Sequence, residues 1–308
     1  MSEKSRILVI KLGALGDFMY ALGPMRAIRD HHKDAHITLL TQKPYVGLAN
    51  KTGFFDDIIL DARPKYNPAD WLSFRKRLND EKFTRVYDLQ NNDRTSLYFK
   101  LFSPRPEWSG IAKGASHRNT DPERQKFHAF IGHRNTLRLA GIENTMLDPL
   151  EWMQSDISRF NLKKPYALLI PGSAPSRPNK RWPAENYHQL AQKLIAAKIQ
   201  PVIIGSNSET ALSAEISQGL DVVNITGQTD LNDIPALARE AIVAIGNDTG
   251  PMHMVSMTGC PSIMFFRSDE STIEKHGPQN PASQSFESDN LNEISIDKVF
   301  AAIEKIAL

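Results

Sequence analysis

The sequence predicts an α/β protein made of two doubly wound, Rossmann-like domains that face each other across a cleft. Three observations lead to this fold class. Short apolar runs rich in Val, Ile and Leu alternate with segments of helical period, as in a parallel sheet covered by helices. This alternation occurs twice, once in each half of the chain. Several apolar runs also end in tight glycine-containing turns that lead directly into a helix.

The first alternating series fills the N-terminal half of the chain. Its expected strands, chosen for their apolar and β-branched content, are 6–11, 36–41, 57–60 and 84–89. A helix is predicted over 18–31, with a kink at Gly23-Pro24 because proline removes a backbone donor.

The second series follows a polar stretch, 156–165, which predicts a boundary between domains 1–160 and 161–308. Strands are expected at 166–170, 201–205, 222–225, 241–245 and 261–266. Between them, apolar residues of helical spacing predict helices over 185–198, 208–219 and 234–239, and a last helix over 292–308.

Composition limits the function classes only broadly. The chain has 308 residues, of which 41% are hydrophobic and 23% charged, with a net charge of +2. These values are typical of a globular protein. The single cysteine, Cys260, excludes an internal disulfide and fits a reducing cytoplasm. Because no apolar run is long enough to span a bilayer and 1–6 lacks a signal-peptide core, we expect a soluble, intracellular protein.

The most informative turn is Gly-Asn-Asp-Thr-Gly-Pro-Met-His, at 246–253. It follows the predicted strand 241–245 and leads into a helix. Free backbone N–H groups and the positive end of the helix dipole meet at such a turn, which favours an anion. Asp248 or Thr249 can also simply cap the helix, and for a single turn that is the better interpretation. Further turns of this kind in the chain favour ligand binding.

A second such turn, Lys-Leu-Gly-Ala-Leu-Gly-Asp at 11–17, follows the first predicted strand. Two glycines three residues apart let the backbone approach a ligand closely. The spacing is neither that of a dinucleotide fingerprint nor that of a Walker A loop. Asp17 stands where the helix begins, so the dipole favours its ionised form and it can accept a proton. On this motif alone, a helix cap is the preferred interpretation of Asp17.

A third loop, at 171–183, follows the strand 166–170 and holds Arg177, Lys180 and Arg181 beside small polar residues. Three cations and free N–H groups can neutralise a diphosphate without a metal ion, whereas a solvated basic loop is the simpler alternative. Two anion-binding loops at neighbouring strand ends of one sheet favour a pocket for a nucleoside diphosphate.

A basic segment, 105–138, carries seven Lys or Arg residues against three acids. This balance points to an anionic partner such as a phosphorylated glycolipid, a nucleic acid or an anionic membrane surface. A solvated loop explains it equally well. Nucleic acid is the weakest of these options, because the segment holds few aromatic residues.

Together the three motifs resemble glycosyltransferase family 9, the ADP-heptose:lipopolysaccharide heptosyltransferases, with Asp-Thr-Gly-Pro-Met-His the most specific part. The region 61–156 gives no sharp match. The resemblance implies a GT-B fold, with an acceptor-side N-terminal domain, a sugar-nucleotide-binding C-terminal domain, and a final helix, 292–308, that crosses back. It further implies inverting, metal-independent transfer of a heptose, with no cofactor, from ADP-heptose to an anionic lipopolysaccharide core acceptor. Cytoplasmic location with a peripheral contact at the inner membrane would follow.

The resemblance also assigns residues. Asp17 would be the general base, and Lys180 would hold the donor phosphates and offset the charge of the leaving group. Donor contacts would come from the phosphate loop, the 246–253 turn and an acid for the ribose: Ser173, Ala174, Asp248, Thr249, Gly250, His253 and Glu209. The acceptor candidates are basic: Lys11, Arg118, Arg124 and Lys126. No metal ligands are expected.

Three other interpretations stay open from the residues alone. A nicotinamide-dependent oxidoreductase lacks support because the third glycine and the acid of its fingerprint are missing. A sugar-nucleotide epimerase of GT-B fold would need no acceptor. A non-catalytic sugar-nucleotide or glycolipid-binding protein would not need Asp17 and Lys180.

Overall fold

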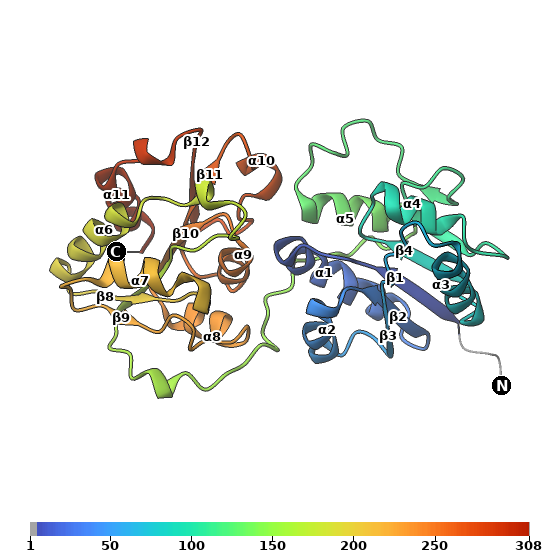
Figure 1. The fold of residues 1–308 in the computed structure, drawn as a ribbon, viewed down its shortest axis with the longest axis horizontal. Helices are drawn as coiled ribbons and strands as arrows, with labels where there is room; N and C mark the ends of the chain where they lie inside the picture. The colour runs from blue at the N-terminus through green and yellow to red at the C-terminus, as the bar shows by residue number, and fades with distance from the viewer. Residues whose placement is uncertain (1–4, 308) are drawn as a thin grey trace. The chain divides into compact units, whose positions relative to one another are not determined.

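The computed structural model describes residues 5–307 and divides the chain into two compact units, Met1–Asp148 and Pro149–Leu308. Each unit has one six-stranded sheet in which all neighbouring strands are parallel, with helices packed around it (Figure 1). The expected α/β class is therefore confirmed.

The first sheet has the strand order β3-β2-β1-β4-β5-β6. Its strands are β1 (Arg6–Ile10), β2 (His36–Thr41), β3 (Asp57–Leu60), β4 (Arg85–Asp88), β5 (Glu107–Gly110) and β6 (His117–Arg118). The direction in which strands are added reverses between β1 and β4, where Ile10 lies beside Asp88. Ligands of open α/β sheets bind at the carboxyl ends of strands at such a switch point.

The helices of the first unit are α1 (Leu15–His31), α2 (Val46–Thr52), α3 (Pro68–Asp80), α4 (Asp93–Phe99) and α5 (Ala129–Arg138), with a 3-10 turn at Lys43–Tyr45. Helix α1 begins three residues earlier than expected and continues as one helix through Pro24. The absence of a side chain at Gly23 has a packing reason, because a Cβ there would lie 1.8 Å from the carbonyl oxygen of Met146.

The second sheet has the order β12-β11-β10-β7-β8-β9. Its strands are β7 (Tyr166–Ile170), β8 (Gln200–Ile203), β9 (Val223–Asn224), β10 (Val243–Asn247), β11 (Ser262–Arg267) and β12 (Ser283–Ser288). The covering helices are α6 (Ala184–Ala196), α7 (Thr210–Ser217), α8 (Asp233–Glu240), α9 (Gly250–Met257), α10 (Ile273–His276) and α11 (Ile296–Ala307), with 3-10 turns at Ser158–Phe160, Pro178–Lys180, Asn207–Glu209 and Leu291–Glu293.

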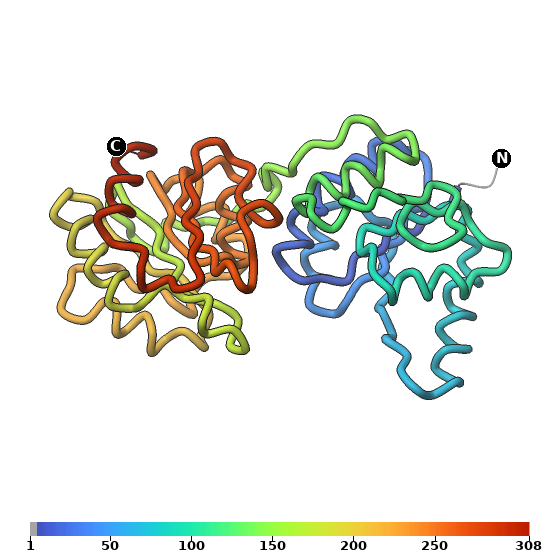
Figure 2. Tube along the Cα trace, turned by 90° about the horizontal axis from the view of Figure 1, so that it is seen from above, coloured from blue at the N-terminus to red at the C-terminus, as the bar shows by residue number. Residues whose placement is uncertain are grey.

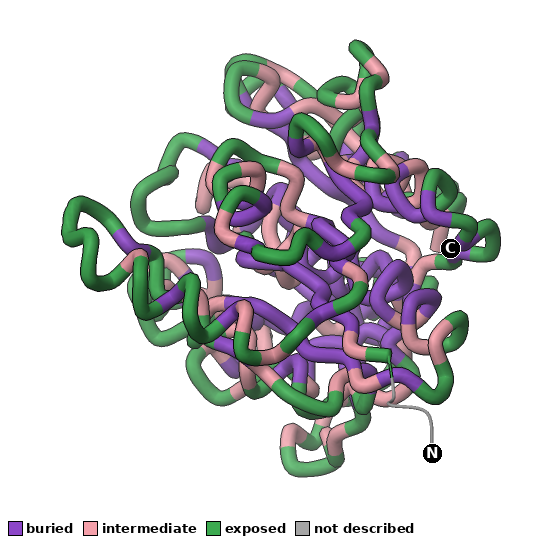
Figure 3. Tube along the Cα trace, turned by 90° about the vertical axis from the view of Figure 1, so that its right-hand side faces the viewer, coloured by how far each residue is buried: buried purple, intermediate pink, exposed green. Residues whose placement is uncertain are grey.

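Each unit has its own apolar core. In the first, Leu8 and Ile10 of β1 pack with Trp108 and with the inner face of α3. In the second, Trp182 stacks on Phe265 with ring centroids 4.6 Å apart. The central strands are the most buried part of the fold, whereas the outer strands are partly exposed and exposed stretches follow the outer helices and loops (Figure 3). The strands thus form a rigid frame whose ends can carry a site.

One expectation about the second unit needs correction. The polar stretch 156–165 does not contain the boundary, because the segment before it already belongs to the second unit: Arg239 donates to the carbonyl of Met153 at 3.0 Å, and Ser155 bonds Asp233 at 2.5 Å. The last helix, α11, packs within the second unit. Its buried residues Val299 and Ile303 complete the core of the second unit beside α6.

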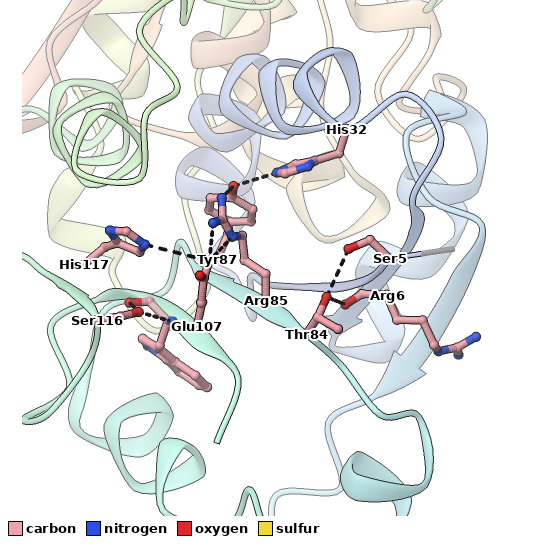
Figure 4. A network of polar contacts seen from close by, with 10 residues as sticks. Ser5, Arg6, His32, Thr84, Arg85, Tyr87, Glu107, Ser116 and His117 are labelled. Carbon is pink, nitrogen blue, oxygen red and sulfur yellow. Dashed lines mark hydrogen bonds and ion pairs between the residues drawn. The ribbon is translucent and has the colours of Figure 1, made fainter. Parts of the chain in front are cut away.

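A polar network joins the amino ends of β4 and β5 to the end of α1 (Figure 4). The ring of His32 lies 2.7 Å from the hydroxyl of Tyr87, to which Arg85 donates at 3.2 Å. Arg85 also pairs with Glu107. Burial, followed by the positive charges of His31, Arg85 and others, lowers the pKa of His32 to about 4. His32 is therefore neutral at physiological pH.

Among the residues from 5 to 307, no helix combines the length and the apolar character that crossing a bilayer requires.

Candidate active site

Most of the predicted site residues form two groups, one in each unit, and both groups lie where parallel strands end. In the second unit they follow β7, β8 and β10. In the first unit, Lys11 and Asp17 follow β1.

Asp248 is the centre of the group in the second unit. It follows β10 directly and lies between two nitrogen groups: Nε2 of His253 is 3.1 Å from Oδ1, and Nζ of Lys180 donates to Oδ2. All three side chains are buried. Burial alone would raise the pKa of Asp248, but the hydrogen bond from His253 and the charge of Lys180 outweigh it and hold the pKa well below its usual range. The group therefore contains a permanent carboxylate.

The loop that carries Lys180 is fastened to β10 by Asn247, which sequence reasoning did not single out. The fully buried amide donates to the carbonyls of Pro171 and Gly172 at 2.8 and 3.1 Å. Its oxygen accepts the backbone N–H of Trp182 at 2.8 Å. One side chain thus pins both ends of the loop 171–183 beside Asp248.

Within that loop, Ser173 serves mainly to shape the backbone. Its hydroxyl donates to the carbonyl of Arg177 at 2.9 Å and accepts from Nε of Arg181 at 3.0 Å. Ala174 is exposed, and its carbonyl accepts the N–H of Arg177 at 2.8 Å. The 3-10 turn Pro178–Lys180, within the loop, ends at the buried Lys180.

Glu209 lies against the same loop, at the end of β8. Its Oε2 accepts from the backbone N–H of Ser206 at 2.6 Å and from the Ser206 hydroxyl at 2.9 Å, as in a capping box. A Cβ on Gly172 would lie 1.5 Å from Oε1 of Glu209. Glycine at 172 therefore allows this carboxylate to approach the loop.

Thr249 and Gly250 form the start of α9, the eight-residue helix after Asp248. Thr249 is the extended N-cap residue, yet its side chain makes no cap bond. Its buried Oγ1 has no hydrogen-bond partner among the residues that the structure describes. Because the first N–H groups of a helix also lack intrahelical partners, this end of α9 is suited to an anion.

In the first unit, Asp17 opens into a pocket of about 250 Å³ that is also lined by Lys11, Arg124 and His133. Lys11 is buried at the end of β1, where Nζ donates to the carbonyl of Leu89 at 3.3 Å. Burial lowers the pKa of Lys11 against the opposing effect of the carboxylates Asp17 and Asp88. The pocket thus combines a carboxylate with basic groups.

Two of the four basic acceptor candidates, Lys11 and Arg124, line this pocket. The other two are not among its lining residues. Arg118 is exposed on β6, with Nε 3.3 Å from the carbonyl of Ile111, and Lys126 is exposed and paired with Glu123 at 2.5 Å.

Two residues near this pocket were not predicted. Asp88 ends β4, and its Oδ1 accepts the backbone N–H groups of Gln90 and Asn91 at 3.0 and 2.9 Å. Burial raises its pKa to about 6. His133 lies on α5, and burial followed by the charge of Lys11 holds its pKa well below the usual value. A carboxylate near the carboxyl end of the predicted strand 84–89 was the available signal for Asp88, whereas nothing in the sequence marked His133.

Comparison with known proteins identifies relatives of this chain. The family model for glycosyltransferase family 9 (heptosyltransferase) matches residues 123–299, which is more than half of the chain. Lipopolysaccharide heptosyltransferase 2 of Escherichia coli (strain K12) is 24% identical over 292 residues, covering 85% of this chain and 82% of the relative.

Solved structures share the fold. A glycosyl transferase family 9 protein from Veillonella parvula superposes with a TM-score of 0.79 at 20% identity, covering 98% of this chain and 97% of that one. The ADP-heptose lps heptosyltransferase II of E. coli gives a TM-score of 0.73 at 20% identity, with 98% of each chain covered. The expected GT-B class, with two Rossmann-like domains, is confirmed.

Proposed function

The chain belongs to glycosyltransferase family 9, the heptosyltransferases, and from this premise we propose that it transfers a heptose from ADP-heptose to a lipopolysaccharide core acceptor with inversion and without a metal ion. The observation that carries the proposal is the buried group of Asp248, Lys180 and His253 at the start of α9. It places a cation, a carboxylate and unpaired helix N–H groups at one strand end, as a sugar nucleotide requires.

The donor site is proposed as follows. The diphosphate lies at the N-terminus of α9, where the N–H groups of Thr249 and Gly250 donate to it. The ammonium group of Lys180 turns from Asp248 toward the phosphates, which leaves the Asp248 carboxylate free to accept from a hydroxyl of the heptose. His253 keeps that carboxylate in place through its 3.1 Å contact.

The nucleoside is proposed to extend over the loop 171–183 toward β8. Glu209 there accepts from the ribose hydroxyls through Oε1, since Oε2 is engaged by Ser206. Ser173 and Ala174 form the loop surface beside the phosphates. No metal enters this scheme, because Lys180 and the helix N-terminus supply the positive charge that the leaving diphosphate requires.

The acceptor is proposed to bind in the pocket of the first unit. The Asp17 carboxylate takes the proton of the acceptor hydroxyl, and the oxygen attacks the anomeric carbon on the face opposite the diphosphate. The bond from that carbon to the diphosphate oxygen breaks, and ADP leaves with the electron pair. Lys11 and Arg124, with Arg118 and Lys126 further out, attract the anionic core. A cytoplasmic location and a peripheral contact with the inner membrane belong to the same proposal.

The test is direct transfer with purified protein, ADP-heptose and a water-soluble core saccharide, with and without EDTA. We expect one heptose added per acceptor, equimolar ADP, an anomeric configuration opposite to that of the donor by NMR, and no loss of rate in EDTA. Parallel reactions with UDP- and GDP-sugars test the donor base. Conversion of the sugar nucleotide without acceptor would instead support the epimerase, and binding without turnover would support a non-catalytic protein.

A further inference from the structure

The segment before α3 and the beginning of that helix expose three large apolar side chains within a short stretch of the chain. Tyr66 is 97% exposed, Leu72 is 65% exposed, and Leu60 at the end of β3 is 51% exposed. In Figure 2, the loop and α3 project from the body of the first unit. We call Leu60, Arg63, Lys65, Tyr66, Leu72 and Arg75 the α3 patch.

The exposed side chains are held by a fixed backbone. Nε1 of Trp71 donates to the carbonyl of Lys65 at 2.9 Å, which ties the loop to the first turn of α3. Asn67 caps the helix by accepting from the N–H of Ala69 at 3.0 Å. At the base of the loop, the hydroxyl of Tyr98 donates to Asp61 at 2.7 Å. The loop therefore presents Tyr66 in a defined conformation.

The charge around these apolar residues is positive. Residues 61–77 contain five Lys or Arg and two Asp. Lys76 and Arg77 are paired with Asp80 and Glu81. Within the described part of the chain, Lys65 and Arg75 form no ion pair, and Arg63 lies 3.8 Å from Asp61 with its side chain 56% exposed. Arg75 shares a face of α3 with Leu72, three residues before it.

The topology places the loop of the α3 patch, between β3 and α3, at the carboxyl edge of its sheet. The strands are parallel, so the end of β3 at Leu60 and the end of β1 at Ile10 lie on the same edge. Asp17 follows that end of β1, and the loop of the patch follows that end of β3. A surface that binds the patch therefore lies at the same edge of the sheet as the proposed acceptor pocket.

We propose that the α3 patch docks the first unit on a bilayer surface that contains anionic phospholipid. Tyrosine prefers the headgroup region, leucine enters the acyl boundary, and each basic residue near an anionic surface adds attraction. The complementarity of a positive patch with phospholipid phosphates favours a membrane over an apolar protein surface. A few exposed apolar side chains are also too small an area for a stable protein interface. The assignment deepens the peripheral membrane contact proposed above and rests on it.

The experiment is flotation of the protein with vesicles that contain no lipopolysaccharide precursor. The vesicles are phosphatidylcholine alone or phosphatidylcholine mixed with phosphatidylglycerol. We expect wild-type protein to bind the mixed vesicles and to be released by high salt. The double variant K65Q/R75Q should bind about twenty-five-fold more weakly, at roughly five-fold for each cation. The double variant Y66S/L72S should bind at least about ten-fold more weakly.

Matched controls remove the same chemistry elsewhere. K298Q/K305Q loses two exposed lysines of α11, and L139S/M146S loses two exposed apolar residues of the first unit. Both controls should bind like wild type. Thermal unfolding and transfer to the water-soluble acceptor should be unchanged in the patch variants, which shows that they are folded.

Equal binding of the patch variants and wild type would overturn the assignment, as would wild-type protein that fails to bind the mixed vesicles. Binding that appears only when a lipopolysaccharide precursor is added would also overturn it and assign the patch to the acceptor. These outcomes are separate from the proposed function, because transfer to the soluble acceptor is measured without vesicles and vesicle binding is measured without donor.

Discussion

Replacing Asn247 with alanine should both destabilise the second unit and disorganise the donor site. The substitution leaves three buried backbone groups without a partner: the N–H of Trp182 and the carbonyls of Pro171 and Gly172. An unpaired buried group costs about 1–3 kcal/mol, so the low end gives a loss of about 3 kcal/mol in the free energy of unfolding. For a unit of this size, that corresponds to a decrease in Tm of roughly 6–12 °C.

The donor site should lose more ADP affinity and activity than the decrease in stability alone explains. Lys180 precedes Trp182 by two residues and Asp248 directly follows Asn247, so a shift of the loop separates the ion pair. A misplacement of about 1 Å can cost roughly 10²-fold in rate. We therefore expect weaker ADP binding and a decrease of about that size in kcat/KM.

The assays are denaturant unfolding and calorimetric titration with ADP. N247D keeps the volume but sets a carboxylate against two carbonyl oxygens, so it should be no more stable than N247A. Asn292→Ala, an exposed asparagine of the same unit, should change stability by less than about 0.5 kcal/mol. A loss below about 1 kcal/mol in N247A, together with wild-type ADP affinity, would refute the reasoning that Asn247 holds the loop.

The remaining predictions concern catalysis, the ribose and pH. D17N should lower turnover by roughly 10²–10⁴-fold with unchanged ADP affinity in calorimetry, and a near-normal rate would remove Asp17 as the base. G172A should weaken ADP binding, because its Cβ meets Glu209 at 1.5 Å, whereas G47A, whose Cβ meets nothing within 4 Å, should not. The pKa of His32 is lowered to about 4 in the folded state, so below about pH 6.5 the unfolded state binds more protons and stability is lost as pH falls toward 4. In urea titrations over pH 4–7, His32→Gln should flatten that decline. Because His32 is partly exposed, the change in the free energy of unfolding should be about 1 kcal/mol or less. Parallel pH curves for the variant and wild type would show that His32 does not cause the decline.

The second unit was the easier half to predict. Its strands at 166–170 and around 241–247 are continuous apolar runs, because both faces of a parallel sheet are buried. Glycine turns then marked where each ends. Strand β12, with the sequence Ser-Gln-Ser-Phe-Glu-Ser, was missed because an edge strand is only partly buried and carries few apolar residues.

The first unit was predictable only as far as β4. The elements α3, α4, β5, β6 and α5 are short or have polar surfaces, and their apolar residues are few. His133 illustrates the limit for the site. Its place in the pocket depends on where α5 packs, beside Lys11, which is more than a hundred residues earlier in the chain. No local sequence pattern predicts such a contact.

The division into two units has an evolutionary consequence. Within residues 5–307, no strand is exchanged between the sheets, and each unit is one continuous stretch of chain. The proposed donor residues all lie in the second unit, whereas the proposed base and acceptor pocket lie in the first. The family model, which matches residues 123–299, covers most of the second unit and only the end of the first. The first unit of such a chain can diversify while the second unit keeps its sugar nucleotide. One recombination event near residue 148 would therefore exchange the whole acceptor-binding unit, and with it the acceptor specificity.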